Sequence, residues 1–310
     1  MSTRIAVRHI YETPEVYDLI YGRNNGYKLG EAYAFAYVLQ RSKLEPKSML
    51  ELFSGVSSYH KRHFLDYYAQ SGQKAPAYFC MDAAASDEDG TIHVQDAVEE
   101  DWGKTFDAVT AHFFSASSIV NFQDGLVKRA HTTKLFANVW AHLNKGGVFL
   151  LDSCADGYIS GTQYTDELRR GIVREYSADP NSKLVESLKG KHKLKPNDWV
   201  TLKVTMDCHY DRATSNNIDV FKKVEAYIND KKVRTYSYEL PFCQRYFSEP
   251  ELRDMLVEAG FKTVKGWRCD YKEHDFSRVE DVLTYDKDLP EDEREDEREI
   301  NLPNVFVAYK

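Results

Sequence analysis

Short apolar segments alternate with helical patterns along much of this chain, and this alternation limits the folds that the chain can adopt. Apolar stretches occupy residues 48–53, 77–81, 106–110 and 148–151, and residues 27–42 carry apolar side chains along one helix face. Strands that alternate with helices indicate right-handed βαβ units and a largely parallel sheet. Continuously apolar strands are expected when helices cover both faces of a sheet. The sequence therefore predicts a doubly wound α/β fold.

An antiparallel insertion interrupts this pattern. Over residues 200–210, apolar and polar side chains alternate strictly, as they do in a strand with one buried face. Residues 218–228 and 232–240 predict two more strands, which a turn at Asn229 and Asp230 joins. We expect these strands to form an antiparallel sheet inserted into the α/β fold.

Helix boundary signals place the remaining elements. Apolar side chains over residues 136–143 predict a helix that ends at the Gly146-Gly147 pair. Ser248 opens a later helix through a capping box. Two strands, near residues 261–267 and 305–309, then complete the predicted sheet.

The composition narrows the classes of function. Lys and Arg number 41 against 49 Asp and Glu, a formal net charge of −8, which argues against binding nucleic acid by bulk charge. No apolar run approaches the ~20 residues of a membrane span, and residues 1–10 lack the apolar core of a secretion signal. The five cysteines are scattered and include no Cys-x-x-Cys pair, so no disulfide framework and no metal site is predicted. We expect a cytoplasmic globular protein.

The most informative segment joins the first strand of the predicted core to the next helix. Glu51 lies near the end of the apolar strand 48–53, and the small-residue turn 54–58 follows at the sheet edge where a ligand can touch the backbone. Asp82 follows the second strand, where a carboxylate can bind two ribose hydroxyls. The three-glycine dinucleotide fingerprint is missing, which disfavours a nicotinamide site.

This ordered set, with Asp96 before the next strand and Gly146-Gly147 later, resembles the class I S-adenosylmethionine-dependent methyltransferases. The resemblance implies a Rossmann-like fold. It also implies that Glu51 and the turn hold the methionine part of the cofactor, that Asp82 holds the ribose and that Asp96 approaches the adenine. The residues expected to bind S-adenosylmethionine are Tyr17, Tyr21, Arg23, Glu51, Phe53, Ser54, Gly55, Asp82, Ala83, Asp96, Ala97 and Phe113.

The first motif departs from the family pattern. The family has two or three glycines there, whereas this chain keeps Gly55 alone, with Phe53 and Ser57 in place of the others. Either the backbone of Phe53 alone faces the ligand, or cofactor binding is weakened.

A closer resemblance is to the small-molecule methyltransferases that dimethylate amino-sugar nucleotides. The segment from Tyr17 to Arg23, and Arg62-His63-Phe64 after the first turn, look similar to that group. In such enzymes the N-terminal segment folds over the cofactor, and an antiparallel insertion shapes the acceptor pocket and often the dimer. Residues 198–240 fit that insertion, so a homodimer through it is a candidate assembly.

The resemblance suggests three segments. Residues 1–165 are expected to form an N-terminal cap and the cofactor-binding core, and residues 166–246 the antiparallel insertion. Residues 247–310 then complete the core sheet. They include an acidic segment at 288–299, which is expected to form a solvent-exposed loop.

The chemistry of methyl transfer points to particular side chains. Aromatic rings attract a sulfonium by about 0.5–2 kcal/mol. The candidates for such a wall are Tyr17, Tyr21, Phe113 and Phe114, with ordinary core packing as the alternative. Arg23 is a candidate partner of the cofactor carboxylate. An amine acceptor must lose a proton before attack, so a base with a pKa near 7 would help. His112 is the best-placed candidate for that catalytic base, and an ordinary buried histidine is the alternative.

We therefore expect a methyltransferase that moves a methyl group to a nitrogen or oxygen of a small molecule, with an amine acceptor favoured. One alternative is a DNA or RNA base methyltransferase, but residues 111–114 lack the prolines of those enzymes, and the net charge is acidic. The other alternative is a methyltransferase-like binding protein without catalysis.

Overall fold

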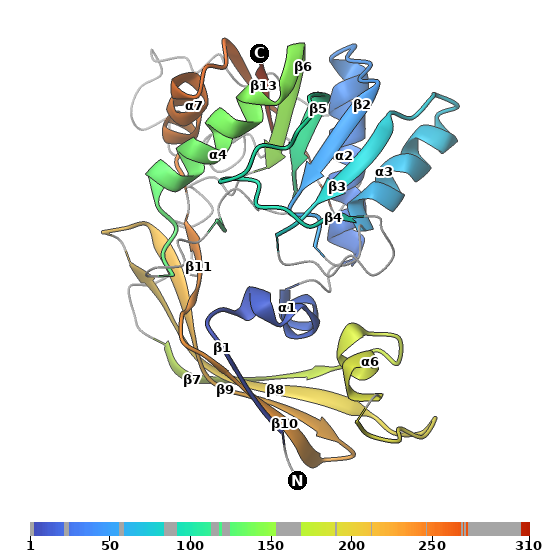
Figure 1. The fold of residues 1–310 in the computed structure, drawn as a ribbon, viewed down its shortest axis with the longest axis vertical. Coiled ribbons are helices and arrows are strands. Elements are labelled where there is room, and N and C mark those ends of the chain that lie inside the picture. The colour runs from blue at the N-terminus through green and yellow to red at the C-terminus, as the bar shows by residue number, and fades with distance from the viewer. Residues whose placement is uncertain are drawn as a thin grey trace, which may run out of the picture. The chain divides into compact units, whose positions relative to one another are not determined.

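In the computed structural model, the chain divides into two compact units (Figure 1). The β unit comprises residues 1–24, 120–127 and 164–245, and the α/β unit comprises residues 25–119, 128–163 and 246–310. The structure describes residues 3–21, 25–55, 59–83, 92–112, 118–119, 125–152, 169–189, 191–211, 213–245, 247–267, 269, 271 and 305–310. The acidic loop at 288–299 lies outside the described residues.

A seven-stranded sheet forms the centre of the α/β unit, in the order β12-β13-β6-β5-β2-β3-β4. The strands β2 to β6 run parallel, and β13 lies antiparallel between β6 and β12. Their bounds are β2 Ser48–Leu52, β3 Ala77–Met81, β4 Ile92–His93, β5 Phe106–Ala111, β6 Leu143–Asp152, β12 Thr263–Trp267 and β13 Val305–Tyr309.

Helices cover both faces of this sheet. On one face, α2 (Asn25–Arg41) and α3 (Tyr59–Gln70) pack Phe35 and Phe64 into the same core cluster as Met49 of β2. On the other face, α4 (Arg129–Ala141) places Phe136 with its ring 5.6 Å from that of Phe149. The helix α7 (Glu249–Glu258) packs beside α4. The predicted doubly wound, mostly parallel sheet is therefore confirmed.

The order of the strands creates a switch point. From β2 the chain proceeds outward through β3 and β4, and it then returns to build β5 and β6 on the other side of β2. The crevice at the carboxyl ends of β2 and β5 is where open sheets of this kind bind ligands.

The β unit has a six-stranded sheet in the order β1-β10-β9-β8-β7, with β11 paired to β9. Apolar side chains of α1 and α6, such as Leu19 and Leu188, pack on Leu202 and Val204 of this sheet. Its elements are β1 Thr3–Val7, the 3₁₀ turn Ile10–Glu12, α1 Pro14–Tyr21, β7 Arg169–Ser177, α6 Lys183–Lys189, β8 Val200–Asp211, β9 Asn216–Ile228, β10 Lys231–Tyr238 and β11 Phe242–Arg245.

The antiparallel strands expected from alternation are present as β8, β9 and β10. The turn at Asn229 and Asp230 has φ angles of 47° and 62°, as a two-residue hairpin turn requires. The N-terminal segment contributes a strand to this sheet. Because β1 pairs in parallel with β10, residues 1–24 belong to the β unit.

Two expected helix boundaries can be compared with the structure. Ser248 caps α7, and its Oγ accepts a hydrogen bond from the Glu251 backbone N–H at 3.3 Å. The helix expected to end at Gly146-Gly147 instead ends at Ala141. Leu143 already belongs to β6, where it pairs with Phe106. The glycine pair lies inside a strand, so that expectation was wrong.

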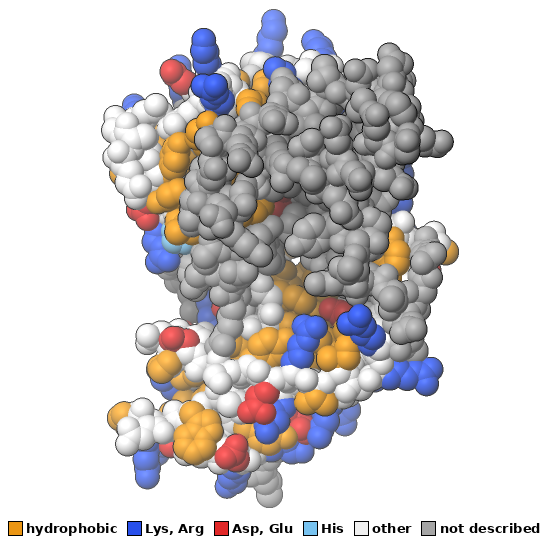
Figure 2. Space-filling model, turned by 180° about the vertical axis from the view of Figure 1, so that it is seen from behind, with side chains coloured by type: hydrophobic (Ala, Val, Ile, Leu, Met, Phe, Trp, Pro, Cys, Tyr) orange, Lys and Arg blue, Asp and Glu red, His pale blue; other side chains and the backbone are white. Residues whose placement is uncertain are grey.

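No helix in the described part of the chain combines the length and the apolar character that a membrane-spanning helix needs. Figure 2 shows acidic and basic side chains interspersed on the described surface of the β unit. Lys203 and Glu175, for example, form an ion pair at 3.2 Å.

One carboxylate of the β unit is buried among donors. Glu225 is 3% exposed and accepts hydrogen bonds from the Tyr227 hydroxyl at 2.6 Å and from Lys232 Nζ at 3.0 Å, while Lys223 Nζ lies 3.0 Å away. Burial alone would raise the pKa of Glu225, but these hydrogen bonds lower it to about 2. A carboxylate with a lowered pKa stabilises the folded state above its unfolded value of 4.5, and this contribution disappears as the pH falls toward 2.

We predict that Glu225→Gln destabilises the protein at pH 7 by about 1–3 kcal/mol. Its stability should also fall less steeply than that of the wild type as the pH is lowered from 5 to 3. Urea unfolding at several pH values measures both effects. Glu175→Gln, at an exposed ion pair, is the control and should change stability by less than about 1 kcal/mol. Equal losses in the two variants would contradict the prediction.

A close backbone contact fixes the start of α2. A Cβ atom at Gly30 would lie 2.0 Å from the backbone oxygen of Tyr271. Only glycine permits this approach.

Gly30→Ala should therefore destabilise the protein by about 1–3 kcal/mol through overpacking, although alanine ordinarily favours a helix. Gly103→Ala, at a left-handed position with open space around it, should cost only about 1 kcal/mol. Thermal unfolding of both variants measures the difference. A stabilised Gly30→Ala variant would contradict the contact with Tyr271.

Candidate functional site

The candidate site lies at the carboxyl ends of β2, β3 and β5 in the α/β unit. The backbone N–H of Ser54 donates to the oxygen of Met81 at 3.2 Å, and the N–H of Gly55 donates to Asp82 Oδ2 at 2.9 Å. The turn after β2 is thus tied to the end of β3. The structure brings together the expected site residues Ser54, Gly55 and Asp82.

The turn has an unusual backbone. Phe53 has a φ angle of 57° and Gly55 one of 65°, and both values lie in the left-handed region. A Cβ at Gly55 would meet nothing within 4 Å, so this side of the turn is open. Phe53 therefore adopts the conformation of a glycine while carrying a large side chain, at a cost of roughly 1–2 kcal/mol.

We predict that Phe53→Gly is more stable than Phe53→Ala by about 1 kcal/mol, because both remove the ring but only glycine relieves the left-handed strain. Urea unfolding of the two variants measures this difference. Ala137→Gly, at an exposed position in the helix α4, is the control, and it should be less stable than the wild type by about 1 kcal/mol. If Phe53→Gly is likewise less stable than Phe53→Ala, then the backbone of Phe53 is not strained.

The acidic residues after β3 and β4 also bond to nearby backbone. The Asp82 N–H donates to the oxygen of His93 at 3.0 Å, which links the ends of these two strands. Asp96 is half-buried, and its Oδ1 accepts hydrogen bonds from the N–H groups of Val98 and Glu99 at 2.8 and 3.1 Å. Of the neighbouring small residues, Ala83 is exposed and Ala97 is buried.

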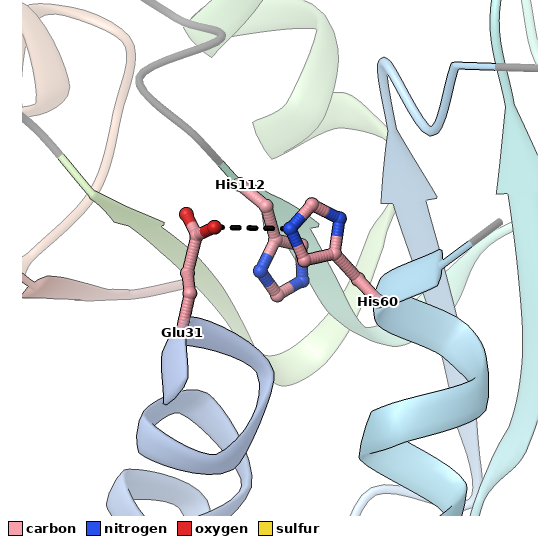
Figure 3. Close-up of side chains that lie close together, drawn as sticks. All are labelled: Glu31, His60 and His112. Carbon is pink, nitrogen blue, oxygen red and sulfur yellow. Dashed lines mark hydrogen bonds and ion pairs between the residues drawn. The ribbon is translucent and has the colours of Figure 1, made fainter. Parts of the chain in front are cut away.

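Four titratable side chains, Glu31, Glu51, His60 and His112, form a cluster at this edge, which we call the buried Glu–His cluster. They come from α2, β2, α3 and the residue directly after β5, and each is at most 6% exposed. His60 Nδ1 lies 3.0 Å from Glu51 Oε1. On its other side, His60 Nε2 lies 2.9 Å from Glu31 Oε2, the contact that Figure 3 marks with a dashed line. The rings of His60 and His112 are stacked, with centroids 4.4 Å apart.

The electrostatics of this cluster follow from its burial. Burial alone would lower the pKa of His60, but the charges of Glu31 and Glu51 and their hydrogen bonds raise it to about 9. Both carboxyls have pKa values below their usual range, because the charge of His60 and its hydrogen bonds outweigh the opposite effect of burial. His60 thus bridges two ionised carboxylates as an imidazolium.

Two residues of the cluster had expected roles. Burial is the main reason why the pKa of His112 falls to about 4, and the nearby charge of His60 lowers it further. This value is well below the pKa near 7 that suits a catalytic base. Glu51 is fully buried, and its second oxygen, Oε2, accepts a hydrogen bond from the Tyr78 hydroxyl at 2.9 Å. The base role of His112 and the cofactor role of Glu51 stay predictions.

The remaining expected cofactor residues belong to the β unit or fall outside the described residues. Tyr17 and Tyr21 pack in the β unit, where Tyr21 donates to Asp219 Oδ2 at 2.9 Å and its ring lies 4.3 Å from that of Phe242. Arg23 and Phe113 fall outside the described residues.

The sequence analysis did not single out Glu31 or His60. Each precedes a buried aromatic residue by four positions, Phe35 and Phe64 respectively, and residues four apart share one face of a helix. A charged side chain on a buried helix face was the signal that could have located the cluster.

No protein-family model matches the chain, and no curated protein matches it. Several solved structures do match the chain. DesVI from Streptomyces venezuelae matches with a TM-score of 0.53 and 17% identity, over 96% of this chain and 97% of that protein. The sugar N-methyltransferase KedS8 from Streptoalloteichus matches with a TM-score of 0.56 and 15% identity, over 99% and 94%. The resemblance inferred from the sequence is therefore confirmed at the level of the Rossmann-like fold.

Proposed function

We propose that this chain is an S-adenosylmethionine-dependent methyltransferase that methylates a nitrogen atom of a small molecule. The observation that carries the proposal is the hydrogen bond from the Gly55 N–H to Asp82 at the switch point of the sheet. It joins the turn after the first strand of the core to the acid after the second strand. These are the two places that the family resemblance assigns to the methionine and ribose parts of the cofactor.

The residues present fit such a cofactor. Gly55 leaves open space beside the backbone of the turn, so a ligand can approach it closely. Asp82 and Asp96 are half-buried carboxylates at successive strand ends, and carboxylates accept hydrogen bonds from hydroxyl and amino groups. Phe53 stands where the family has a glycine, and its backbone holds a left-handed conformation, which glycine adopts most readily.

When bound, S-adenosylmethionine supplies a methyl group on a positively charged sulfur that departs neutral. The protein's task is therefore to hold the acceptor in line and to exclude water. His112, with a pKa of about 4, is uncharged at neutral pH and is a weak base for an amine acceptor. An amine that is already unprotonated when it binds suits this environment.

A nitrogen acceptor is favoured over oxygen because the structurally similar KedS8 is a sugar N-methyltransferase. Residues 166–246 remain our proposed source of the acceptor pocket and of a homodimer interface.

Binding of S-adenosylhomocysteine, measured by calorimetry, tests the proposal. The wild type should bind at micromolar levels, and Asp82→Ala should weaken binding by about 1–3 kcal/mol through lost hydrogen bonds. Asp82→Asn keeps one acceptor oxygen and should lose less. Asp66→Ala, at an exposed position of α3, is the control and should leave the affinity unchanged.

The alternatives give different outcomes. A wild-type chain that is folded by circular dichroism but binds no S-adenosylhomocysteine would refute the proposal and favour a binding protein without catalysis. If the chain binds the cofactor, transfer of a labelled methyl group to amino sugars, but not to DNA or RNA, would support a small-molecule acceptor. Transfer to a nucleic acid base alone would refute it.

A further inference from the structure

The buried Glu–His cluster contains the donor set of a metal site. A carboxylate oxygen of Glu31 and one ring nitrogen each of His60 and His112 all lie within 4.8 Å of one another. The three residues come from α2, α3 and the end of β5, and all are buried (Figure 3). Residues from separate elements that converge in this way can enclose an ion.

The spacing of two of these donors suits a transition metal. Zinc binds nitrogen and oxygen ligands at about 2.0–2.2 Å, so two ligands of one tetrahedral ion lie about 3.4 Å apart. Glu31 Oε2 and His60 Nε2 are 2.9 Å apart. An ion can therefore replace the proton between them if these two atoms separate by about half an ångström.

A second shell is already in place. A histidine that binds a metal usually donates its other ring N–H to a carboxylate, which fixes the orientation of the ring. His60 Nδ1 lies 3.0 Å from Glu51 Oε1, and Tyr78 holds the other oxygen of Glu51 at 2.9 Å. This chain of contacts orients His60 Nε2 toward Glu31.

The charge of the cluster also favours a divalent cation. The carboxylates of Glu31 and Glu51 are fully buried, and His60 lies within hydrogen-bond distance of both. Asp152, which is also buried, makes a side-chain hydrogen bond to Glu31. With one imidazolium, Glu31, Glu51 and His60 together carry a net negative charge, whereas a divalent ion beside a neutral His60 balances these two carboxylates. Buried charges are tolerated best when they are fully paired.

We propose that Glu31, His60 and His112 bind a divalent transition metal ion of the zinc class, with Glu51 positioning His60. Two imidazoles and one carboxylate form a donor set that suits zinc and cobalt better than magnesium or calcium. The ion ties α2 and α3 to the carboxyl end of β5. The site shares His112 and Glu51 with the residues expected at the methyl-transfer site, but metal binding is measured separately from methyl transfer.

The test uses the untagged full chain, stripped with a chelator and then equilibrated with Zn²⁺ or Co²⁺. We expect one tightly bound ion per chain by elemental analysis, a visible absorption band from bound Co²⁺, and a higher melting temperature with Zn²⁺. His112→Gln and Glu31→Gln should lose the stoichiometric ion and the shift in melting temperature. His63→Gln, on a partly exposed position of α3, should keep both.

Glu51→Gln keeps all three ligands and should weaken metal affinity by about 10–100-fold. This variant keeps the test decisive if a ligand variant fails to fold. A wild-type chain that binds no stoichiometric Zn²⁺ or Co²⁺ would overturn the proposal, as would unchanged binding by folded His112→Gln. Equal loss in His63→Gln would instead place the ion on the surface. Titration with S-adenosylhomocysteine in metal-free buffer is a separate readout, so the two proposals can fail independently.

Discussion

The paired hydrogen bonds of His60 to Glu31 and Glu51 hold together three elements that the sequence keeps far apart. They connect the first long helix of the α/β unit, the central strand β2 and the helix that follows the turn after β2. Because the three groups are buried, removing one partner would leave an uncompensated charge, which is far more costly than losing an exposed ion pair. The position of α3, and with it the exit of the turn Phe53–Gly55, therefore depends on this contact.

The turn itself combines strain with support. Phe53 occupies a left-handed conformation that costs energy, while the N–H groups of Ser54 and Gly55 bond to the end of β3. Strained backbone persists where the surrounding structure overdetermines it, and such positions concentrate at functional sites. The same hydrogen bond that stabilises the turn also orients Asp82, so the shape of the backbone and the placement of the carboxylate are set together.

Local patterns predicted most of the elements, because burial and alternation are encoded within a few residues. The strands β2, β3, β8 and β13 and the helix α2 lie close to their expected bounds. The pattern failed at Leu143, where an apolar residue one position past a helix cap already belongs to a strand. The cluster of Glu31, His60 and His112 joins positions up to 81 residues apart, and no local period encodes such a contact. The pairing of Thr3 with Arg234 could not be predicted from the sequence for the same reason.

Two strands pair with partners far away in the sequence, so their contacts form late in folding. Thr3–Val7 pairs with Lys231–Tyr238, and Val305–Tyr309 enters the other sheet between β6 and β12. Contacts so distant in sequence form slowly, and one edge of β6 is unpaired until β13 is in place. Because unpaired strand edges promote aggregation, the insertion of β13 protects the folding chain as well as completing its sheet.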